Sequence, residues 1–200
     1  MRSVRFAVVG KGLFGSAAAR HLAQAGHEVL LIGPDEPSEA QTHAGVFASH
    51  HDAGRITRVL DRDPVWAALA RASLDTHAHL AAETGIRFHH PHPVLYADAG
   101  SGDLTEAVRA TASHFEAALD ATVDVPTALH LPEGARASIE RGDAGWIEPR
   151  RLVQAQTLAA LAAGARVLRS PVWALRDARP DGTRLILDDG SEVLAERVLL

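Results

Sequence analysis

The chain has 200 residues, 46% of them hydrophobic, with a formal net charge of −5 at pH 7 and no cysteine. The apolar content allows a sizeable core, and the absence of cysteine excludes disulfide bridges and thiolate metal sites. A weakly acidic chain lacks the basic surface of a nucleic-acid binder, and no apolar run is long enough to span a bilayer. Because the sequence also lacks a signal-peptide pattern, we predict a cytoplasmic protein with neither nucleic-acid nor membrane partners.

The first informative stretch is an apolar run, residues 6–9, that ends in a Gly-x-Gly-x-x-Gly pattern and opens onto an alanine-rich helical pattern. A second strand is predicted at residues 27–32, so the stretch fits the dinucleotide-binding unit of about thirty residues. In such a unit one glycine turns the chain, one lets a pyrophosphate approach the backbone, and one lets helix and strand pack closely. The alternative is a glycine-rich turn without a ligand. The candidate cofactor-binding residues are Gly10, Gly12, Leu13, Phe14 and Gly15.

The end of the second predicted strand departs from this pattern. Such units carry an acid for the ribose hydroxyls at this position, but here it is Gly33, followed by Pro34, Asp35 and Glu36. Gly33, Pro34 and Asp35 are cofactor-binding candidates, with Asp35, Glu36 or a backbone N–H and water replacing the acid. A ribose 2′-phosphate would need a nearby arginine. Residues 21–54 contain neither lysine nor arginine, which disfavours NADP.

The middle of the chain combines a polar segment with helical and extended patterns. Residues 49–58 gather two histidines, an acid and two arginines. Apolar spacing predicts a helix over residues 64–84 and a second helix from Asp103, capped by that residue, whose buried face continues to Leu119. A short strand is predicted at residues 94–96.

Two stretches are weakly patterned. His89, His90 and His92 lie in a proline-broken stretch. We predict that it is a solvated loop without a carboxylate partner and that the chain has no metal site. Residues 124–145 are rich in proline and glycine and are predicted as a loop or short strands.

The last third of the chain is patterned more clearly. Pro149 near a first turn and Gly164 after a last turn predict a helix between them. Its predicted buried face consists of Leu152, Ala155, Leu158, Ala159 and Ala162. Four short apolar runs follow and predict a further parallel strand and an antiparallel meander. These runs are residues 166–168, 172–175, 184–187 and 192–194. Because the sequence ends inside an apolar strand pattern, we expect a longer protein.

Three blocks of the sequence, by their order and spacing, resemble the D-amino-acid-oxidase superfamily of FAD-dependent oxidoreductases, most of all its sarcosine-oxidase branch. The blocks are residues 8–15, 49–58, and 145–152 leading to 164–168. The resemblance implies an α/β fold, in which a Rossmann-like FAD-binding domain with a parallel sheet and an antiparallel β-meander is joined by the start of a second α+β substrate lobe. The expected domains are residues 1–85 and 146–200 for the two parts of the FAD-binding domain and 86–145 for the lobe.

The same resemblance implies roles for the second block. Ser49, His50, His51 and Arg55 would lie near the flavin, with His51 and Arg55 as the catalytic candidates, and Arg58 would hold a substrate carboxylate. A guanidinium suits that task because it binds a carboxylate through two parallel hydrogen bonds and keeps its charge. The alternatives are structural histidines and an Arg58 that pairs with a nearby aspartate. The candidate partners are Asp52, Asp61 and Asp63.

Two further positions follow from the resemblance. Val172 would contact the adenine through its backbone, or would be an ordinary core valine. Lys11 replaces the small residue that the family carries between the first two glycines, which puts its ammonium near the pyrophosphate or in water.

The implied function is that of an FAD-dependent amine or amino-acid oxidase or dehydrogenase acting on a small molecule. A hydride would leave the carbon next to nitrogen for the flavin, and water would hydrolyse the resulting imine. The glycine pattern alone also suits an NAD-dependent dehydrogenase, although the missing ribose acid and residues 49–58 count against it. A catalytically silent nucleotide-binding subunit of a larger complex is a third hypothesis.

Overall fold

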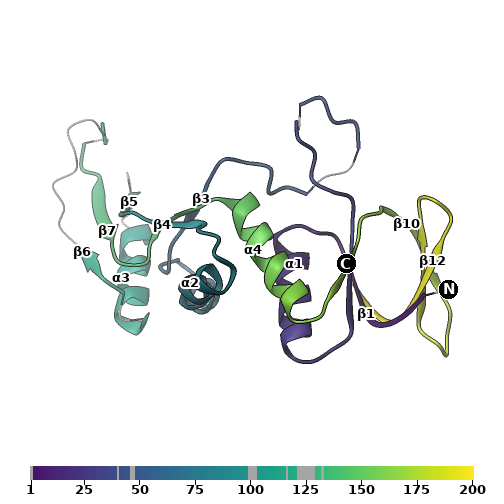
Figure 1. Cartoon of the computed structure of the whole chain (residues 1–200). Coiled ribbons are helices and arrows are strands. Elements are labelled where there is room, and N and C mark those ends of the chain that lie inside the picture. The colour runs from purple at the N-terminus through teal and green to yellow at the C-terminus, as the bar shows by residue number, and fades with distance from the viewer. Residues whose placement is uncertain are drawn as a thin grey trace. The chain divides into compact units, whose positions relative to one another are not determined.

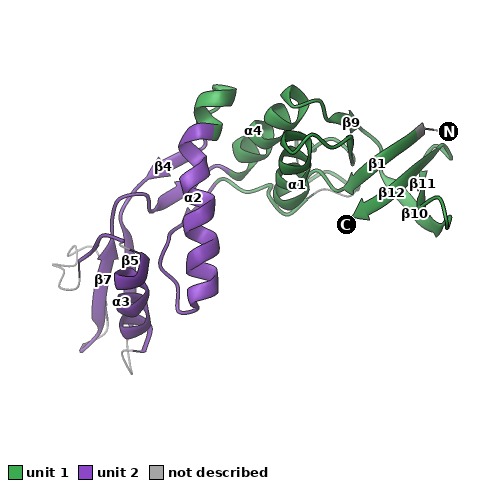
Figure 2. Cartoon of the chain, turned by 90° about the horizontal axis from the view of Figure 1, so that it is seen from below, with its two compact units in different colours: residues 1–53, 80–87, 149–200 green, residues 54–79, 88–148 purple. Residues whose placement is uncertain are grey.

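The computed structural model describes residues 2–39, 41–45, 48–98, 103–115, 117–120, 129–131 and 133–200. The chain divides into two compact units, coloured separately in Figure 2. Unit 1 consists of residues 1–53, 80–87 and 149–200, and unit 2 consists of residues 54–79 and 88–148. The sequence-based division after residues 85 and 145 stays a prediction.

Unit 1 is built on a six-stranded sheet with the strand order β10-β11-β12-β1-β2-β9 (Figure 1). Strands β12, β1, β2 and β9 run parallel to one another, and β10 and β11 pair antiparallel beside β12, which completes a meander. The predicted parallel strand and meander are therefore confirmed. The strands are β1 (Arg2–Val9), β2 (Val29–Ile32), β9 (Arg166–Leu168), β10 (Val172–Asp177), β11 (Thr183–Leu187) and β12 (Glu192–Leu199).

Strand β2 shows why the centre of this sheet is apolar on both faces. All four of its residues are buried. Val29 and Leu31 pack on the side of the helices, and Leu30 and Ile32 pack on the opposite side. Alternate side chains of a strand point to opposite faces, so a strand covered on both sides reads as a continuous apolar run. Full burial of each such side chain stabilises the fold by about 1.5–3 kcal/mol.

Helices α1 (Leu13–Gln24) and α4 (Pro149–Ala162) lie side by side against one face of this sheet (Figure 1). Small residues at the contact allow a close approach, with Ala19 and Ala23 of α1 buried in the same cluster as Ala160. Helix α4 begins at Pro149, where a missing N–H costs nothing because the first amides of a helix have no partner within it.

The predicted buried face of α4 is wrong at two positions. Leu158 is 45% exposed, and Ala162 is exposed as well. The buried stripe includes Ala155 and Ala159. Leu158 comes one residue before Ala159, which rotates it by about 100° around the helix axis and away from that stripe.

Unit 2 contains two three-stranded sheets and most of the long helix α2 (Pro64–Thr84), whose bounds match the prediction. One sheet has the order β3-β8-β4 and the other has the order β5-β7-β6. The strands are β3 (Arg55–Thr57), β4 (His89–Pro91), β5 (Val94–Asp98), β6 (Leu119–Asp120), β7 (Arg136–Glu140) and β8 (Gly145–Ile147). Strand β7 lies within the predicted stretch 124–145, and β8 begins at its end. Residues 124–128 and 132 of that stretch fall outside the described part.

Helix α3 (Asp103–Phe115) is shorter than the sequence predicted. Its Val108 and Ala112 are buried in the core of unit 2, and Leu119 packs against the same core from strand β6, where it pairs with Glu140. The apolar spacing therefore correctly predicted that Leu119 packs against this core and wrongly placed it on the helix. At the other end, the carboxylate of Asp98 accepts a hydrogen bond from the Leu104 N–H at 3.0 Å.

The histidines of residues 89–92 do not form a solvated loop. His89 and His90 belong to β4, and the His90 ring stacks on Trp146 with ring centroids 4.1 Å apart. The His90 Nε2 lies 2.8 Å from Glu148 Oε1. That carboxylate stands 58 residues further along the chain, so the local sequence did not reveal it. Among the described helices, none has the length and apolar character needed to cross a membrane.

Candidate functional site

The glycine-rich turn between β1 and α1 has the geometry of a phosphate loop, a name we use for residues 10–15. Gly10 has φ 106, in the left-handed region that favours glycine. Its N–H donates to the Ile32 carbonyl at 2.7 Å, which ties the turn to β2. A Cβ on Gly15 would overlap the Gly10 carbonyl oxygen. The first and third glycines are therefore required by the backbone itself.

The start of α1 is open to an anion. Gly12 occupies the N-cap position, no side chain caps the helix there, and its first turn carries no acidic residue. The first amides of a helix carry a partial positive charge and bind phosphate when side chains do not cap them. Leu13 is half-buried and Phe14 is 92% exposed. These features fit the pyrophosphate of a dinucleotide.

The second sequence block lies against the phosphate loop. A Cβ on Gly12 would be 3.0 Å from the Ala48 Cβ and 3.7 Å from His50 Nδ1. His50 is buried, and its Nε2 lies 3.4 Å from Glu36 Oε1. Residues nearly forty positions apart in the sequence are thus neighbours, and any side chain at position 12 would compete with them for space.

Glu36 connects His50 to the third block. Its Oε1 lies 2.8 Å from Nε of Arg150, in the first turn of α4. Glu36 therefore lies beside both His50 and Arg150, so one residue from each of the second and third blocks meets it within unit 1. The sequence suggests Glu36 only as a ribose acceptor and marks no role for Arg150, although that arginine lies inside the third block.

The other predicted residues of unit 1 are placed as follows. His51 Nε2 lies 3.2 Å from the Pro37 carbonyl oxygen, and Ser49 is exposed. Val172 begins β10, pairs with Leu187 and packs partly buried against the sheet core, as the core alternative describes. Its contact with adenine stays a prediction.

The corner at the end of β2 contains a charge cluster. Gly33 is buried, Pro34 is half-buried, and Asp35 is exposed. Asp35 Oδ1 lies 2.6 Å from the Lys11 Nζ and 3.2 Å from the Arg169 Nε. A basic residue does lie near the expected ribose position, contrary to the argument from residues 21–54, because the chain returns there after β9.

Arg55 and Arg58 belong to unit 2. Arg55 begins β3 and pairs with Ile147. Arg58 makes the local ion pair that the alternative interpretation describes, with its Nη2 2.9 Å from Asp61 Oδ2. Its Nε also donates to the Leu60 carbonyl at 2.9 Å, and its guanidinium lies 5.8 Å from the centre of the Tyr96 ring. The role of Arg58 toward a substrate stays a prediction.

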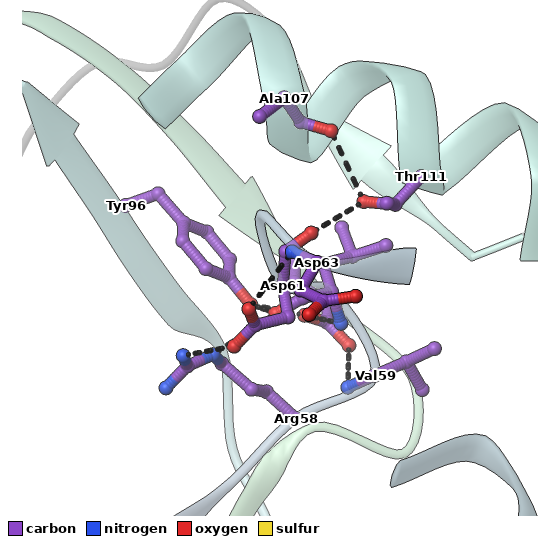
Figure 3. A network of polar contacts seen from close by, with 9 residues as sticks. Arg58, Val59, Asp61, Asp63, Tyr96, Ala107 and Thr111 are labelled. Carbon is purple, nitrogen blue, oxygen red and sulfur yellow. Dashed lines mark hydrogen bonds and ion pairs between the residues drawn. The ribbon is translucent and has the colours of Figure 1, made fainter. Parts of the chain in front are cut away.

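A buried carboxylate, that of Glu140, accepts hydrogen bonds from the backbone that follows Arg58. Glu140 is 1% exposed, and its two oxygens accept the Val59 N–H at 2.7 Å and the Leu60 N–H at 3.2 Å. The Tyr96 hydroxyl also donates to Glu140, at 2.5 Å. Burial, followed by the hydrogen bond and negative charge of Glu140, raises the pKa of Tyr96 far above its usual range. Figure 3 shows Arg58, Asp61 and Tyr96 gathered at this turn.

The same turn borders a pocket of about 360 Å³ in unit 2, here called the arginine pocket. Its lining includes the charged residues Arg58, Asp61 and Arg62, together with Tyr96 and the apolar Leu104. Two guanidinium groups against one carboxylate leave the charged lining with a net positive charge. Such a pocket suits a small ligand with an anionic group and an apolar part. Sequence reasoning missed Glu140 and Tyr96, which no short motif marks.

Several solved structures share this fold over nearly the whole chain. NikD, an unusual amino acid oxidase essential for nikkomycin biosynthesis, is 21% identical, with a TM-score of 0.73 covering 99% of this chain and 51% of its own. L-proline dehydrogenase from P. horikoshii is 16% identical, with a TM-score of 0.76 and coverages of 98% and 52%. Glycine oxidase from Geobacillus kaustophilus is 19% identical, with a TM-score of 0.71 and coverages of 99% and 55%.

At these identities the likeness establishes the fold, and the chain spans about half the length of these proteins. No protein of curated function matches the sequence. A sequence profile of the family described as DAO, FAD dependent oxidoreductase, matches residues 5–200. The predicted resemblance is thereby confirmed, and the open phosphate loop fits the cofactor that the family description names. The chain belongs to the DAO family of FAD-dependent oxidoreductases.

Proposed function

We propose that this chain is the FAD-binding half of an oxidase or dehydrogenase that oxidises the C–N bond of an amine or amino acid, with a sarcosine-oxidase-like preference for a secondary amine. The observation that carries the proposal is that residues from all three blocks behind the family resemblance are linked. Gly12 of the phosphate loop lies beside His50, and Glu36 lies beside both His50 and Arg150. The printed names of similar structures, an amino acid oxidase, a glycine oxidase and a proline dehydrogenase, support the substrate class.

The chain's own residues would bind and orient the cofactor. The amides at the start of α1 would hold the pyrophosphate, with Gly12 leaving room for it. Ser49, His50, His51 and Arg55 would line the flavin, with His51 and Arg55 beside its reactive part. Bound FAD supplies the redox chemistry by accepting a hydride from the carbon next to the substrate nitrogen.

The substrate carboxylate would bind at Arg58. The arginine pocket supports this role because it combines guanidinium groups with an apolar wall, as a small amino acid requires. Arg58 would then exchange its surface ion pair with Asp61 for the carboxylate of the ligand. Such an exchange costs little, because exposed ion pairs contribute at most about 1 kcal/mol.

The test is anaerobic reduction of the flavin in the intact protein. The absorbance of bound FAD is followed after addition of sarcosine, glycine, proline and matched amines that lack the carboxylate. Bleaching by amino acids, with weaker bleaching by the matched amines, is the expected result. Tight binding of NAD with no FAD in the denatured supernatant would favour the NAD-dependent alternative. Bound FAD that no amine reduces would favour the catalytically silent subunit.

A further inference from the structure

At the end of β2, two departures from the dinucleotide pattern lie against each other: Gly33, which replaces an acid, and Lys11, which replaces a small residue. A Cβ built on Gly33 would lie 3.1 Å from Lys11 Cγ and 3.2 Å from the Lys11 backbone nitrogen. Contacts this short require one of the neighbours to move, and the backbone nitrogen belongs to the phosphate loop. The stem of Lys11 therefore fills the space into which an acidic side chain at position 33 would extend.

The ammonium of Lys11 is held at this corner. The Lys11 side chain is only 16% exposed, and its Nζ lies 2.6 Å from Asp35 Oδ1. Arg169 approaches the same oxygen, with its Nε at 3.2 Å. Two cations and one carboxylate leave a net positive charge where the usual unit presents a negative one. The Lys11 hydrogen bond is the leading cause that lowers the pKa of Asp35, so this carboxylate stays ionised at neutral pH.

A lysine ammonium carries three hydrogen-bond donors, and Asp35 accepts one of them. A ribose hydroxyl both donates and accepts hydrogen bonds, so its oxygen is bound equally well by a cationic donor. Hydrogen bonds with a charged partner are also about twice as strong as neutral ones. A cation at this corner can therefore still bind a ribose hydroxyl. The protein then donates the hydrogen bond, whereas a carboxylate would accept it.

We propose that Lys11 replaces the missing acid at position 33 and binds a ribose hydroxyl of the adenosine half of FAD as a donor, with Asp35 and Arg169 as positioning residues. The inference rests on the proposed FAD binding and goes beyond it by assigning the ribose contact to one side chain. It also explains why Gly33 is a glycine, since a larger residue would displace the lysine.

The first experiment pairs Lys11 with individual hydroxyls of the ligand. The intact apoprotein is titrated with FAD by flavin fluorescence, and ADP, 2′-deoxy-ADP and 3′-deoxy-ADP are used as competitors. In the wild type, one deoxy analogue should bind roughly 10- to 100-fold more weakly than ADP, the range for a hydrogen bond with a charged group. In Lys11→Ala, ADP should weaken by a similar factor, and the same deoxy analogue should bind as ADP does.

Other outcomes would overturn the proposal. If Lys11→Ala weakens ADP and both deoxy analogues by the same factor, Lys11 binds the pyrophosphate. If Asp35→Asn removes the discrimination while Lys11→Ala preserves it, Asp35 is the direct acceptor. Arg166→Ala is the matched control, because it removes a cation from an exposed ion pair with Glu28 in the same unit. It should leave every affinity unchanged.

The second experiment restores the usual arrangement. Gly33→Glu alone should weaken FAD binding at least tenfold and lower the melting temperature of the apoprotein, because the new side chain meets Lys11. The double variant Lys11→Ala with Gly33→Glu removes the contact with Lys11 Cγ and keeps the one with the backbone nitrogen. It should bind FAD more tightly than Gly33→Glu alone, with the glutamate as the acceptor. Wild-type affinity in Gly33→Glu alone would contradict the proposal. Flavin reduction by amines is measured separately, so failure of the ribose assignment leaves the proposed reaction standing.

Discussion

The phosphate loop of unit 1 and the arginine pocket of unit 2 are built from different kinds of group. In the phosphate loop the backbone is the functional part, since Gly15 is forced by the Gly10 carbonyl and the helix amides face outward. In the arginine pocket the functional parts are side chains, and a buried Glu140 holds the backbone that carries Arg58. A site made of backbone tolerates no added atom, whereas a site made of side chains depends on each partner.

This difference predicts opposite sensitivities. Adding one methyl group should damage the phosphate loop, because a Cβ on Gly12 or Gly15 meets a neighbour, and Gly10 has a φ of 106 that other residues rarely adopt. Removing a functional group should damage the arginine pocket, because buried polar groups there lose their partners. The predictions below test each side of this comparison.

Glu140→Ala should have the largest effect on stability. Its loss leaves the Val59 and Leu60 amides without their acceptor inside the core, and it leaves the Tyr96 hydroxyl with only the Leu60 carbonyl, at 3.0 Å. A buried donor without an acceptor costs about 1–3 kcal/mol, so the two amides predict a loss of about 2–6 kcal/mol. Urea denaturation should show this loss in unit 2. Glu133→Ala, at an exposed acid of the same unit, is the control and should change the free energy of unfolding by less than about 0.5 kcal/mol. A loss of under about 1 kcal/mol in Glu140→Ala would show that the pocket does not depend on this carboxylate.

Arg58→Ala should reduce activity more than stability. If Arg58 binds the substrate carboxylate, losing the pair costs about 2–5 kcal/mol, which lowers kcat/KM roughly thirtyfold to several thousandfold for an amino acid. A matched amine without the carboxylate should lose much less. Arg58→Lys keeps the charge but loses the two parallel hydrogen bonds and should fall in between. The flavin spectrum and the melting temperature should barely change.

An equal loss for both substrates would show that the Asp61 ion pair is the whole role of Arg58. Arg62→Ala provides the comparison within the pocket, since Arg62 lines the same space. If Arg62→Ala instead lowers kcat/KM for the amino acid more than for the matched amine, the carboxylate is bound by Arg62.

Gly15→Ala tests the backbone-built region. The new Cβ overlaps the Gly10 carbonyl oxygen, so the turn must move, with an expected loss of about 1–3 kcal/mol in stability. FAD affinity should fall with it, because the same backbone holds the pyrophosphate. Gly12→Ala is the graded control: its Cβ meets side chains and no backbone, with the Ala48 Cβ at 3.0 Å and His50 Nδ1 at 3.7 Å. It should therefore weaken FAD binding with a smaller change in melting temperature. Equal melting temperatures for both variants would contradict the backbone requirement.

The same comparison explains what the sequence could predict. Local patterns determine the phosphate loop, helix α2 and the meander, because glycine spacing and apolar periodicity act through the neighbouring backbone. The Glu140 network and the His90–Glu148 contact join residues far apart in the sequence, so no local pattern contains them. Arg169 is a third case. It approaches Asp35, the partner of Lys11, because the chain returns to this corner after β9.

Tyr96 offers the finest test, through the pH dependence of stability. Burial and Glu140 raise its pKa above the ordinary value of 10.0. Above about pH 10 the unfolded chain loses the tyrosine proton while the folded protein keeps it, so the folded state binds more protons and stability falls as pH rises. The maximal slope is about 1.4 kcal/mol per pH unit.

Urea denaturation of the wild type and Tyr96→Phe between about pH 8 and about pH 11 should show this contribution as a difference in slope. Tyr96→Phe starts from a lower free energy of unfolding because Glu140 loses a donor, but its alkaline slope should be shallower. Tyr96 is the only tyrosine among these 200 residues, so phenolate absorbance reports its titration directly. Phenolate that forms in the folded protein near the ordinary value would show that the hydroxyl is open to solvent. The Tyr96 side of the arginine pocket would then not depend on the buried hydrogen bond to Glu140, and the proposed contrast with the phosphate loop would fail.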